Sequence, residues 1–296
     1  KENITYILNS LKLKINEIEK DKKILHIFNS KYLLDKKPLE NLPIGLFGNF
    51  YSQELSFFLI NNNDHKNIHN ILNQCNLKIK KIISKNFIEG ASLIYNTPDI
   101  DTFFKIKIFE NDSQIILFEN SALKFSQDFK FGTNLIINDI SKVIGLKSEE
   151  VRELIQNSNS FENATEGETI DKKLFNYINF RKIKKKLIKD IAEARINEIL
   201  EIIIIKNINL INFLNKNTPV FLEINDQLIT KHFLNYFKKF LFEKKNVTTS
   251  YLDKSTPESL YVDAYRIVQY GWKKEALPII QEKKSPISRI FDFIFN

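Results

Sequence analysis

FFKIKIFENDSQIILFENSALKFSQDFKFGTNLIINDISKVI, residues 103–144, is the stretch of the chain that decides the fold class. Residues 103–109 and 114–118 are apolar runs that indicate strands, and the second continues through ENSALKFSQDFKF. Residues 134–144 have helical spacing, with an expected apolar stripe of Ile136, Ile137, Ile140 and Val143. Gly145 suits the position just after a helix end. Strands followed directly by a helix predict an α/β fold.

The same periodicities, applied outward from this stretch, predict further elements. Helices are expected at 3–19, 64–76, 88–95, 148–156, 180–206, 228–242 and 257–276, and strands at 24–28, 55–60, 79–83 and 220–224. We expect a turn at Gly45–Gly48, and we expect Ser148 to be an N-cap. The helix at 64–76 should turn Ile68, Ile71 and Leu72 inward.

Composition excludes several classes of function. The single cysteine, Cys75, rules out a disulfide framework and a cysteine-based metal site. His65 and His69 share a helical spacing without a carboxylate motif, so we interpret them as solvated surface and predict no metal site. The net charge of +8 comes from a chain rich in Lys, Asn and Ile, and no nucleic-acid motif supports it, so we expect no nucleic-acid partner.

The beginning of the chain carries no recognisable targeting segment. No signal peptide opens it, and no window of 18 apolar residues occurs. The sequence contains no Met, even at position 1. We therefore expect that further residues precede Lys1.

The tail SPISRIFDFIFN, residues 285–296, is unusually apolar for a terminus. Its apolar residues have the spacing of an amphipathic helix that follows two lysines: Ile287, Ile290, Phe291, Ile294 and Phe295, after Lys283 and Lys284. The pattern alone favours docking on the protein's own core. Insertion at a membrane interface is the alternative.

Four segments, in this order and spacing, resemble the family of the bacterial cell-division protein FtsA, which is actin-like: ILHIFNSKYLLDKKPLENLPIGLFG (24–48), ALKFSQDFKFGTNLIINDISKVIGLKSEEVREL (122–154), ARINEIL (194–200) and SPISRIFDFIF (285–295). The likeness covers nearly the whole chain. It implies an α/β, actin-like (ribonuclease-H-like) two-domain fold with an inserted small α+β subdomain and a truncated first domain.

The resemblance also implies a domain organisation. Residues 1–23 would be a remnant of the first subdomain, 24–84 the inserted subdomain, 85–100 a return helix, 101–145 and 207–277 the second subdomain, 146–206 the partner-binding subdomain, 278–286 a linker and 287–296 a membrane-targeting helix. The family's first phosphate-contacting turn has no counterpart in this chain.

The family's nucleotide motifs are degenerate in this chain. Actin-like ATPases cradle phosphates with glycine-rich turns, but residues 107–113 and 223–226 contain no glycine. The degenerate site comprises Lys107, Phe109, Asn111, Ser113, Glu223 and Asn225. Glu110 and Asp112 would repel a triphosphate; we interpret these acids and Glu223 as turn residues, with a relocated catalytic cluster as the alternative. We expect no cofactor; ATP-Mg²⁺ in a diverged pocket, making the chain an ATPase, is the alternative.

By the same resemblance, Arg195 and Glu198 would lie in a groove that binds the C-terminal tail of FtsZ, with Lys186 and Lys189 adding positive charge. The alternative is a solvated helix face carrying an intrahelical ion pair. The family's basic residue further up this helix falls at Leu187.

The resemblance favours a membrane role for the tail. The chain would be a cell-division scaffold at the cytoplasmic face of the inner membrane, at the division site. It would tether FtsZ filaments, self-associate and bind other division proteins. The remaining alternative is an actin-like assembly factor of a pilus or secretion machine.

Overall fold

The computed structural model describes residues 2–159, 161, 164–175, 181–214, 217–245, 249–252 and 256–276. Contacts within the chain divide it into two units, and each unit is described by itself. Unit 1 comprises Lys1–Asp101, Phe118–Phe125 and Ser255–Asn296; unit 2 comprises Thr102–Leu117 and Ser126–Lys254. None of the helices in the described ranges has the length and hydropathy needed to cross a bilayer.

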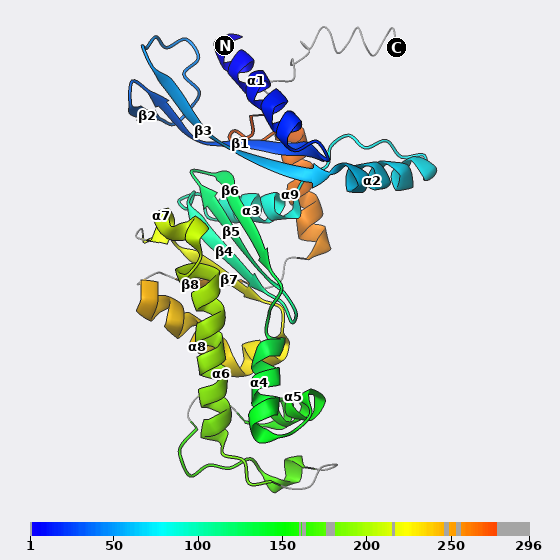
Figure 1. Ribbon diagram of the computed structural model, residues 1–296, viewed down its shortest axis with the longest axis vertical. Coiled ribbons are helices and arrows are strands. Elements are labelled where there is room, and N and C mark those ends of the chain that lie inside the picture. Colours follow the sequence, from blue (N-terminus) through cyan, green and yellow to red (C-terminus); the bar gives the residue numbers. More distant parts are fainter. Residues whose placement is uncertain are drawn as a thin grey trace. The chain divides into compact units, whose positions relative to one another are not determined.

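Unit 1 is built on a three-stranded antiparallel sheet of order β2-β1-β3 (Figure 1). Its elements are α1 (Glu2–Ile18), β1 (Lys22–Leu34), β2 (Lys37–Leu39), β3 (Tyr51–Asn61), α2 (Asn62–Gln74), α3 (Lys85–Asn96) and α9 (Pro257–Tyr270). The predicted first helix and the strands within β1 and β3 are confirmed, and both strands extend further than expected.

The core of unit 1 joins α1 to β1. Ile4 and Leu8 of α1 pack with Ile27 of β1 and with Ala276. The short segment that contains Ala276 adds to the same sheet, because the Ala276 N–H donates to the Ile27 carbonyl at 2.7 Å and Glu275 bridges Phe28. Burying this apolar cluster supplies the stability that a small sheet lacks by itself.

Three predictions about unit 1 are wrong. No residue of α2 is buried, and Ile71 is 61% exposed, because α2 continues outward from the end of β3 (Figure 1). The apolar run at 79–83 forms no strand; its isoleucines are half-buried in an irregular segment, so the run indicated burial and not sheet pairing. The final helix ends at Tyr270 and not at 276, since Gly271 takes a left-handed φ of 74°.

Unit 2 contains most of a five-stranded sheet of order β6-β5-β4-β7-β8, in which β4, β7 and β8 are parallel. Its strands are β4 (Phe103–Ile108), β5 (Ser113–Glu119), β6 (Ala122–Phe129), β7 (Val220–Ile224) and β8 (Thr249–Tyr251). Its helices are α4 (Asn134–Ile144), α5 (Ser148–Asn157), α6 (Lys185–Leu200), α7 (Ile211–Leu214) and α8 (Gln227–Lys245), with single 3₁₀ turns at Lys172–Leu174 and Ile208–Leu210. The prediction of an α/β fold is confirmed.

The stretch expected as one long second strand is two strands. Asn120 and Ser121 have φ values of 52° and 63°, so they form a two-residue turn between β5 and β6. Left-handed conformations at both central positions are typical of the tight turns that join antiparallel strands. The three-residue strand β8 was not predicted, because it is too short to show a period.

Two helix predictions in unit 2 need correction. The helix expected at 180–206 begins at Lys185, and its α-helical part ends at Leu200, where Glu201–Ile205 widens into a π-helical turn. Ser148 is the first residue of α5 and not its N-cap; the preceding Lys147 N–H donates to the Glu150 carboxylate at 2.7 Å.

The division into units also differs from the expected domain organisation. Contacts within the chain group α9 with unit 1, whereas the family resemblance implied that residues up to 277 belong to the second subdomain.

Candidate partner-binding groove

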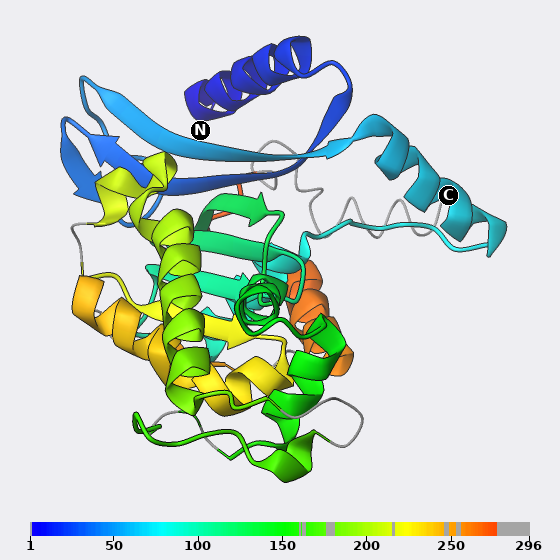
Figure 2. The same cartoon turned by 60° about the horizontal axis from the view of Figure 1, so that its bottom comes forward.

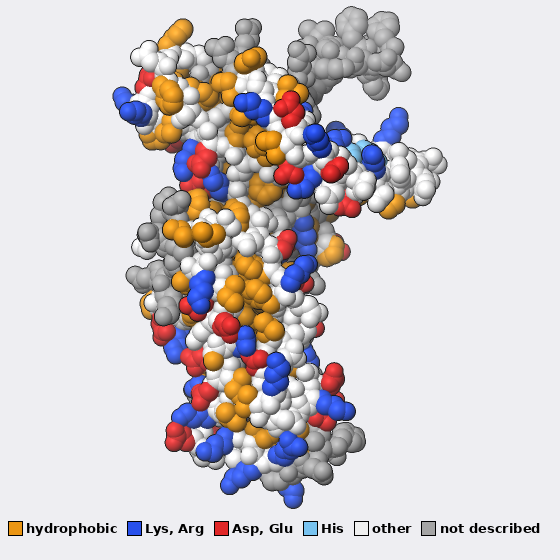
Figure 3. Space-filling view, viewed as in Figure 1, with side chains coloured by type: hydrophobic (Ala, Val, Ile, Leu, Met, Phe, Trp, Pro, Cys, Tyr) orange, Lys and Arg blue, Asp and Glu red, His pale blue; other side chains and the backbone are white. Residues whose placement is uncertain are grey.

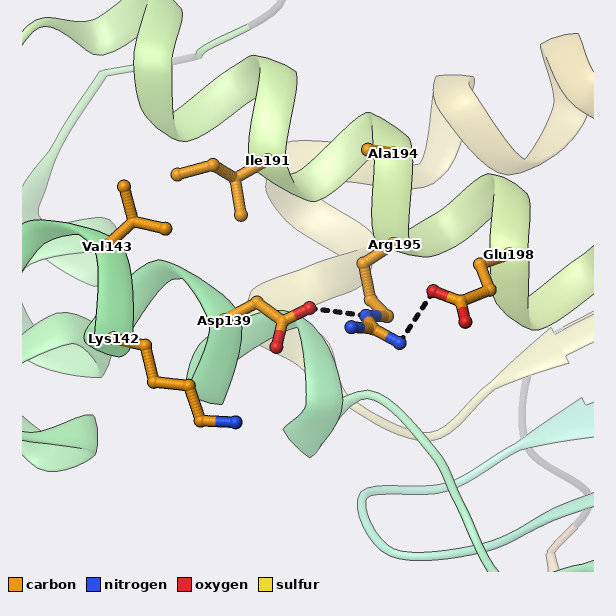
Figure 4. Close-up of a pocket in the computed structure, with 7 residues that line it drawn as sticks. All are labelled: Asp139, Lys142, Val143, Ile191, Ala194, Arg195 and Glu198. Atoms are coloured by element: carbon orange, nitrogen blue, oxygen red, sulfur yellow. Dashed lines mark hydrogen bonds and ion pairs between the residues drawn. The ribbon is translucent and has the colours of Figure 1, made fainter.

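A groove lies between α4 and α6, two helices that pack side by side in unit 2 (Figure 2). Each helix buries one apolar stripe and turns a second, mixed face toward the other helix. The groove has a volume of about 310 Å³ and is lined by Asp139, Lys142, Val143, Ile191, Ala194, Arg195 and Glu198 (Figure 4). The lining residues repeat at intervals of three and four, which places them on one face of each helix.

Arg195 is held between two carboxylates. Its Nε pairs with the Asp139 carboxylate of α4, and one Nη donates to Glu198 at 2.7 Å (Figure 4). The pair with Asp139 crosses the groove, while the pair with Glu198 runs along α6. Because an arginine presents a planar fork of donors, two carboxylates fix the guanidinium in one orientation.

Lys142 and the apolar residues complete the groove. Lys142 is exposed, and no carboxylate within the described ranges lies within ion-pair distance of its ammonium group. Val143, which the sequence analysis placed in the core, is 58% exposed and points across the groove toward Ile191 (Figure 4). Figure 3 shows hydrophobic side chains exposed between α4 and α6, flanked by charges of both signs. An apolar floor beside an unpaired cation suits a peptide with apolar side chains and a carboxylate.

The groove contains only some of the residues predicted to bind a partner. Arg195 and Glu198 line it, but Lys186 and Lys189 do not. Lys186 instead pairs with Glu166 at 2.5 Å, and this hydrogen bond raises the pKa of the lysine. Sequence reasoning missed the contribution of α4. Lys142 and Val143 are exposed and Asp139 is half-buried, but the expectation that Val143 faces inward left this face of α4 unassigned.

The structure brings the predicted degenerate nucleotide positions together at the carboxyl ends of β4 and β7. Lys107 and Glu223 are register partners on these strands. The buried Lys105 ammonium lies 3.0 Å from the Glu223 carboxylate, and the Asn225 amide donates to the other oxygen of Glu223 at 3.2 Å. In open α/β sheets ligands bind at this edge, but here charged side chains occupy it.

Residues at the turn between β4 and β5 also form hydrogen bonds and packing contacts within unit 2. The Asn111 side-chain Oδ1 accepts from the Asn134 side-chain amide at 2.7 Å, and the Ser113 hydroxyl donates to the Phe131 backbone carbonyl at 2.7 Å. Phe109 lies under the Lys107 ammonium, 5.9 Å from the ring centroid. A Cβ on Gly132 would meet the Phe109 carbonyl at 2.1 Å, so the two loops are packed backbone against backbone.

Asp226, which sequence reasoning left without a role, is the centre of a polar network at the same edge. Its carboxylate accepts from the Thr133 hydroxyl at 2.8 Å and from the N–H groups of Leu228 and Ile229, and it lies 3.4 Å from Arg152. Accepting these N–H groups caps the start of α8. The predicted membrane-binding residues, Lys283, Lys284, Ile287, Ile290, Phe291, Ile294 and Phe295, lie outside the described residues.

No protein-family model matches the chain, and no curated protein matches it. Among solved structures it is similar to a PilM–PilN type IV pilus biogenesis complex (10% identity, 95% of this chain and 74% of that chain, TM-score 0.49). It is also similar to MreB5 of Spiroplasma citri bound to ADP (12% identity, 71% and 66%, TM-score 0.47) and to the ethanolamine utilization protein EutJ of Carboxydothermus hydrogenoformans (12% identity, 55% and 47%, TM-score 0.36). The chain therefore spans less than two thirds of the MreB5 and EutJ chains, and identities this low assign no function.

Proposed function

We propose that this chain is an actin-like scaffold that binds a short peptide segment of a partner protein in the groove between α4 and α6. The observation that carries the proposal is the convergence of Arg195 and Glu198, singled out by the family resemblance, with Val143 and Ile191 in one open groove. A scaffold of this kind needs a recognition surface and no catalytic centre.

In its finer form, the proposal identifies the peptide as the C-terminal tail of FtsZ. The chain would tether FtsZ filaments to the cytoplasmic face of the inner membrane through its amphipathic tail. It would also self-associate and bind other division proteins. The order of the four FtsA-like segments supports this form. The filled edge at β4 and β7 supports a scaffold whose nucleotide site is degenerate.

The charges of the groove suggest how the peptide is held. Arg195 already has two carboxylate partners, so an incoming carboxylate either displaces Glu198 or pairs with Lys142. Displacing Glu198 costs little free energy, because the ion pair between Arg195 and Glu198 is partly exposed to water. Lys142 offers a second cation at the same groove, and Val143 and Ile191 offer apolar contact area.

The test is fluorescence anisotropy with a labelled FtsZ C-terminal peptide and the full chain. Arg195→Glu should abolish binding, because it places a third carboxylate in the groove. Val143→Glu should also abolish it, by charging the apolar floor. Lys189→Glu makes the same charge change as Lys142→Glu but lies outside the groove, so only Lys142→Glu should weaken binding strongly.

Unchanged affinity in Arg195→Glu and Val143→Glu would refute the groove. Loss of binding in Lys189→Glu alone would indicate that the peptide binds another face of α6. A second experiment tests the tether by liposome flotation of the full chain against a chain ending at Lys284. Equal flotation of the two would exclude the tail as the anchor.

A further inference from the structure

A second concave site lies in unit 1, between α1, the start of β1, α2 and residues 79–82. Its cavity has a volume of about 460 Å³. Six of the residues that line it are basic: Lys12, Lys23, His65, His69, Lys80 and Lys81. None of its described lining residues is acidic, which distinguishes it from the groove between α4 and α6.

The positive charge of this basic pocket is largely uncompensated. Lys81 pairs with the Glu275 carboxylate at 2.7 Å. Within the described ranges, no carboxylate lies within 4.0 Å of the ammonium groups of Lys12, Lys23 or Lys80. The nearby Glu19 is engaged by Lys22 at 3.0 Å, and Asp64 accepts from the Asn61 amide.

Two imidazoles stand among these lysines. His65 and His69 are one turn apart on α2, both half-buried, with ring centroids 4.4 Å apart. Their sequence pattern predicted solvated surface for both. Burial lowers the pKa of His65, and the charges of Lys23 and His69 lower it further, as expected where cations gather without counterions. Among the described residues, no group of three or more His, Cys, Asp or Glu side chains is placed to hold a metal ion.

We propose that the basic pocket binds a phosphate group, either of a free phosphate compound or of a phosphomonoester lipid headgroup. Four lysines from three segments, together with two imidazoles that can donate or become charged, match an anion with several acceptor oxygens and up to two charges. The cavity makes this a site and not a flat basic surface, since the basic residues line one concave space. The inference is independent of the peptide groove, which lies in unit 2.

Proton uptake is part of the proposal. The groups that face the imidazoles are Lys12 of α1, Lys23 of β1, and Lys80 and Lys81 of the 79–82 segment, with Glu275 behind Lys81. The charge of Lys23 disfavours the imidazolium form of His65, and a bound anion reverses that effect. Phosphate binding should therefore raise the pKa of His65 and should strengthen as pH falls from about 8 to about 6.

The binding test is calorimetry of the full chain with inorganic pyrophosphate, supplemented by flotation on phosphatidylcholine vesicles with and without phosphatidic acid. Lys12→Glu/Lys80→Glu should weaken pyrophosphate binding at least about tenfold, since each change replaces a cation of the lining by an anion. The matched control, Lys66→Glu/Lys78→Glu, makes the same charge change outside the lining and should stay within about threefold of wild type.

A measurement on the unaltered chain removes any dependence on folding of the variants. Pyrophosphate should shift the NMR signals of His65 and His69, assigned with His65→Gln and His69→Gln, and should leave the signal of His232, which is buried in unit 2, unchanged. In the double variant His65→Gln/His69→Gln, the affinity for pyrophosphate should lose the pH dependence that the protein contributes. The pH dependence that remains in this variant is due to protonation of pyrophosphate itself.

Selective binding to phosphatidic acid vesicles would identify a lipid headgroup as the source of the phosphate, and pyrophosphate binding alone would identify a free compound. Absence of both, unshifted signals of His65 and His69, or equal losses in the Lys12/Lys80 and Lys66/Lys78 variants would overturn the proposal.

Discussion

The groove between α4 and α6 and the basic pocket of unit 1 differ in whether their cations have carboxylate partners. In the groove, Arg195 is matched by Asp139 and Glu198, and the floor is apolar. In the pocket, Lys12, Lys23 and Lys80 lie together without a carboxylate partner within the described ranges. A balanced, partly apolar surface suits a peptide, whereas an unbalanced one suits a small anion.

The difference shows that the overall charge of +8 is a poor guide to function until each cation is assigned its partner. The pocket itself contains the contrast, since Lys81 is compensated by Glu275 and its neighbours are not. Four experiments test this distinction between paired and unpaired charges, in order of expected effect.

The largest effect is expected at Glu275, whose side chain is fully buried. It accepts from His26 Nδ1 at 2.8 Å and from Lys81 at 2.7 Å, while His26 Nε2 accepts from the Ser84 N–H. Glu275→Ala leaves these partners unmatched, so the free energy of unfolding should fall by about 3–5 kcal/mol in urea titrations. Lys80→Ala, which removes an unpaired lysine, should change it by less than about 0.5 kcal/mol. Equal losses would erase the distinction.

The next largest effect is expected at Asp226. Asp226→Ala removes the cap of α8 and the acceptor of the Thr133 hydroxyl, so it should lower the free energy of unfolding, measured by urea titration, by about 2 kcal/mol.

The same edge of the sheet offers a test of nucleotide binding. If these charges stabilise the fold and bind no nucleotide, ATP-Mg²⁺ should leave the melting temperature of the wild-type chain unchanged, because a ligand that binds only the folded state raises the melting temperature. Calorimetry that gave low-micromolar binding of ATP-Mg²⁺ would contradict the degenerate site.

The acid range offers a smaller and separate effect. Burial raises the pKa of Glu275, but the hydrogen bonds from His26 and Lys81 outweigh it, and the pKa lies below its ordinary value of 4.5. A carboxyl with a lowered folded-state pKa contributes stability above its unfolded pKa and loses it as pH falls through the folded pKa. The stability advantage of wild type over Glu275→Gln should therefore be constant at neutral pH and shrink below about pH 4.5. A difference that grows on acidification would have the wrong sign.

The sequence predicted elements with a clear period and missed features that depend on partners. α4 was predicted at its observed bounds, because Ile136, Ile137 and Ile140 mark one buried stripe. Val143 belongs to the same apparent stripe but faces the groove, and only the position of α6 decides this. Similarly, the run at 79–83 has the composition of a strand but no pairing partner in the sheet.

The two candidate sites were predictable to different degrees. Arg195 and Glu198 were found by family resemblance, but their partner Asp139 lies on another helix and has no signature of its own. The basic pocket gathers lysines from distant segments of the chain in a sequence already rich in lysine. Proximity in space, which no local pattern encodes, makes them a site.

The smallest effect on stability is expected in the groove, at Glu198. Its carboxylate is 51% exposed, so the pair with Arg195 is screened by water, and Glu198→Gln should change the free energy of unfolding by no more than about 0.5 kcal/mol. The same change frees one donor of the Arg195 fork for an incoming carboxylate, so affinity for the FtsZ tail peptide should rise and not fall. Anisotropy titrations of Glu198→Gln beside Glu193→Gln, a carboxylate of α6 outside the groove lining that pairs with Lys239, separate the two effects. A large loss of stability in Glu198→Gln would mean that the charges of the groove stabilise the fold, as those around Glu275 do, and that the groove is not a surface kept available for a partner.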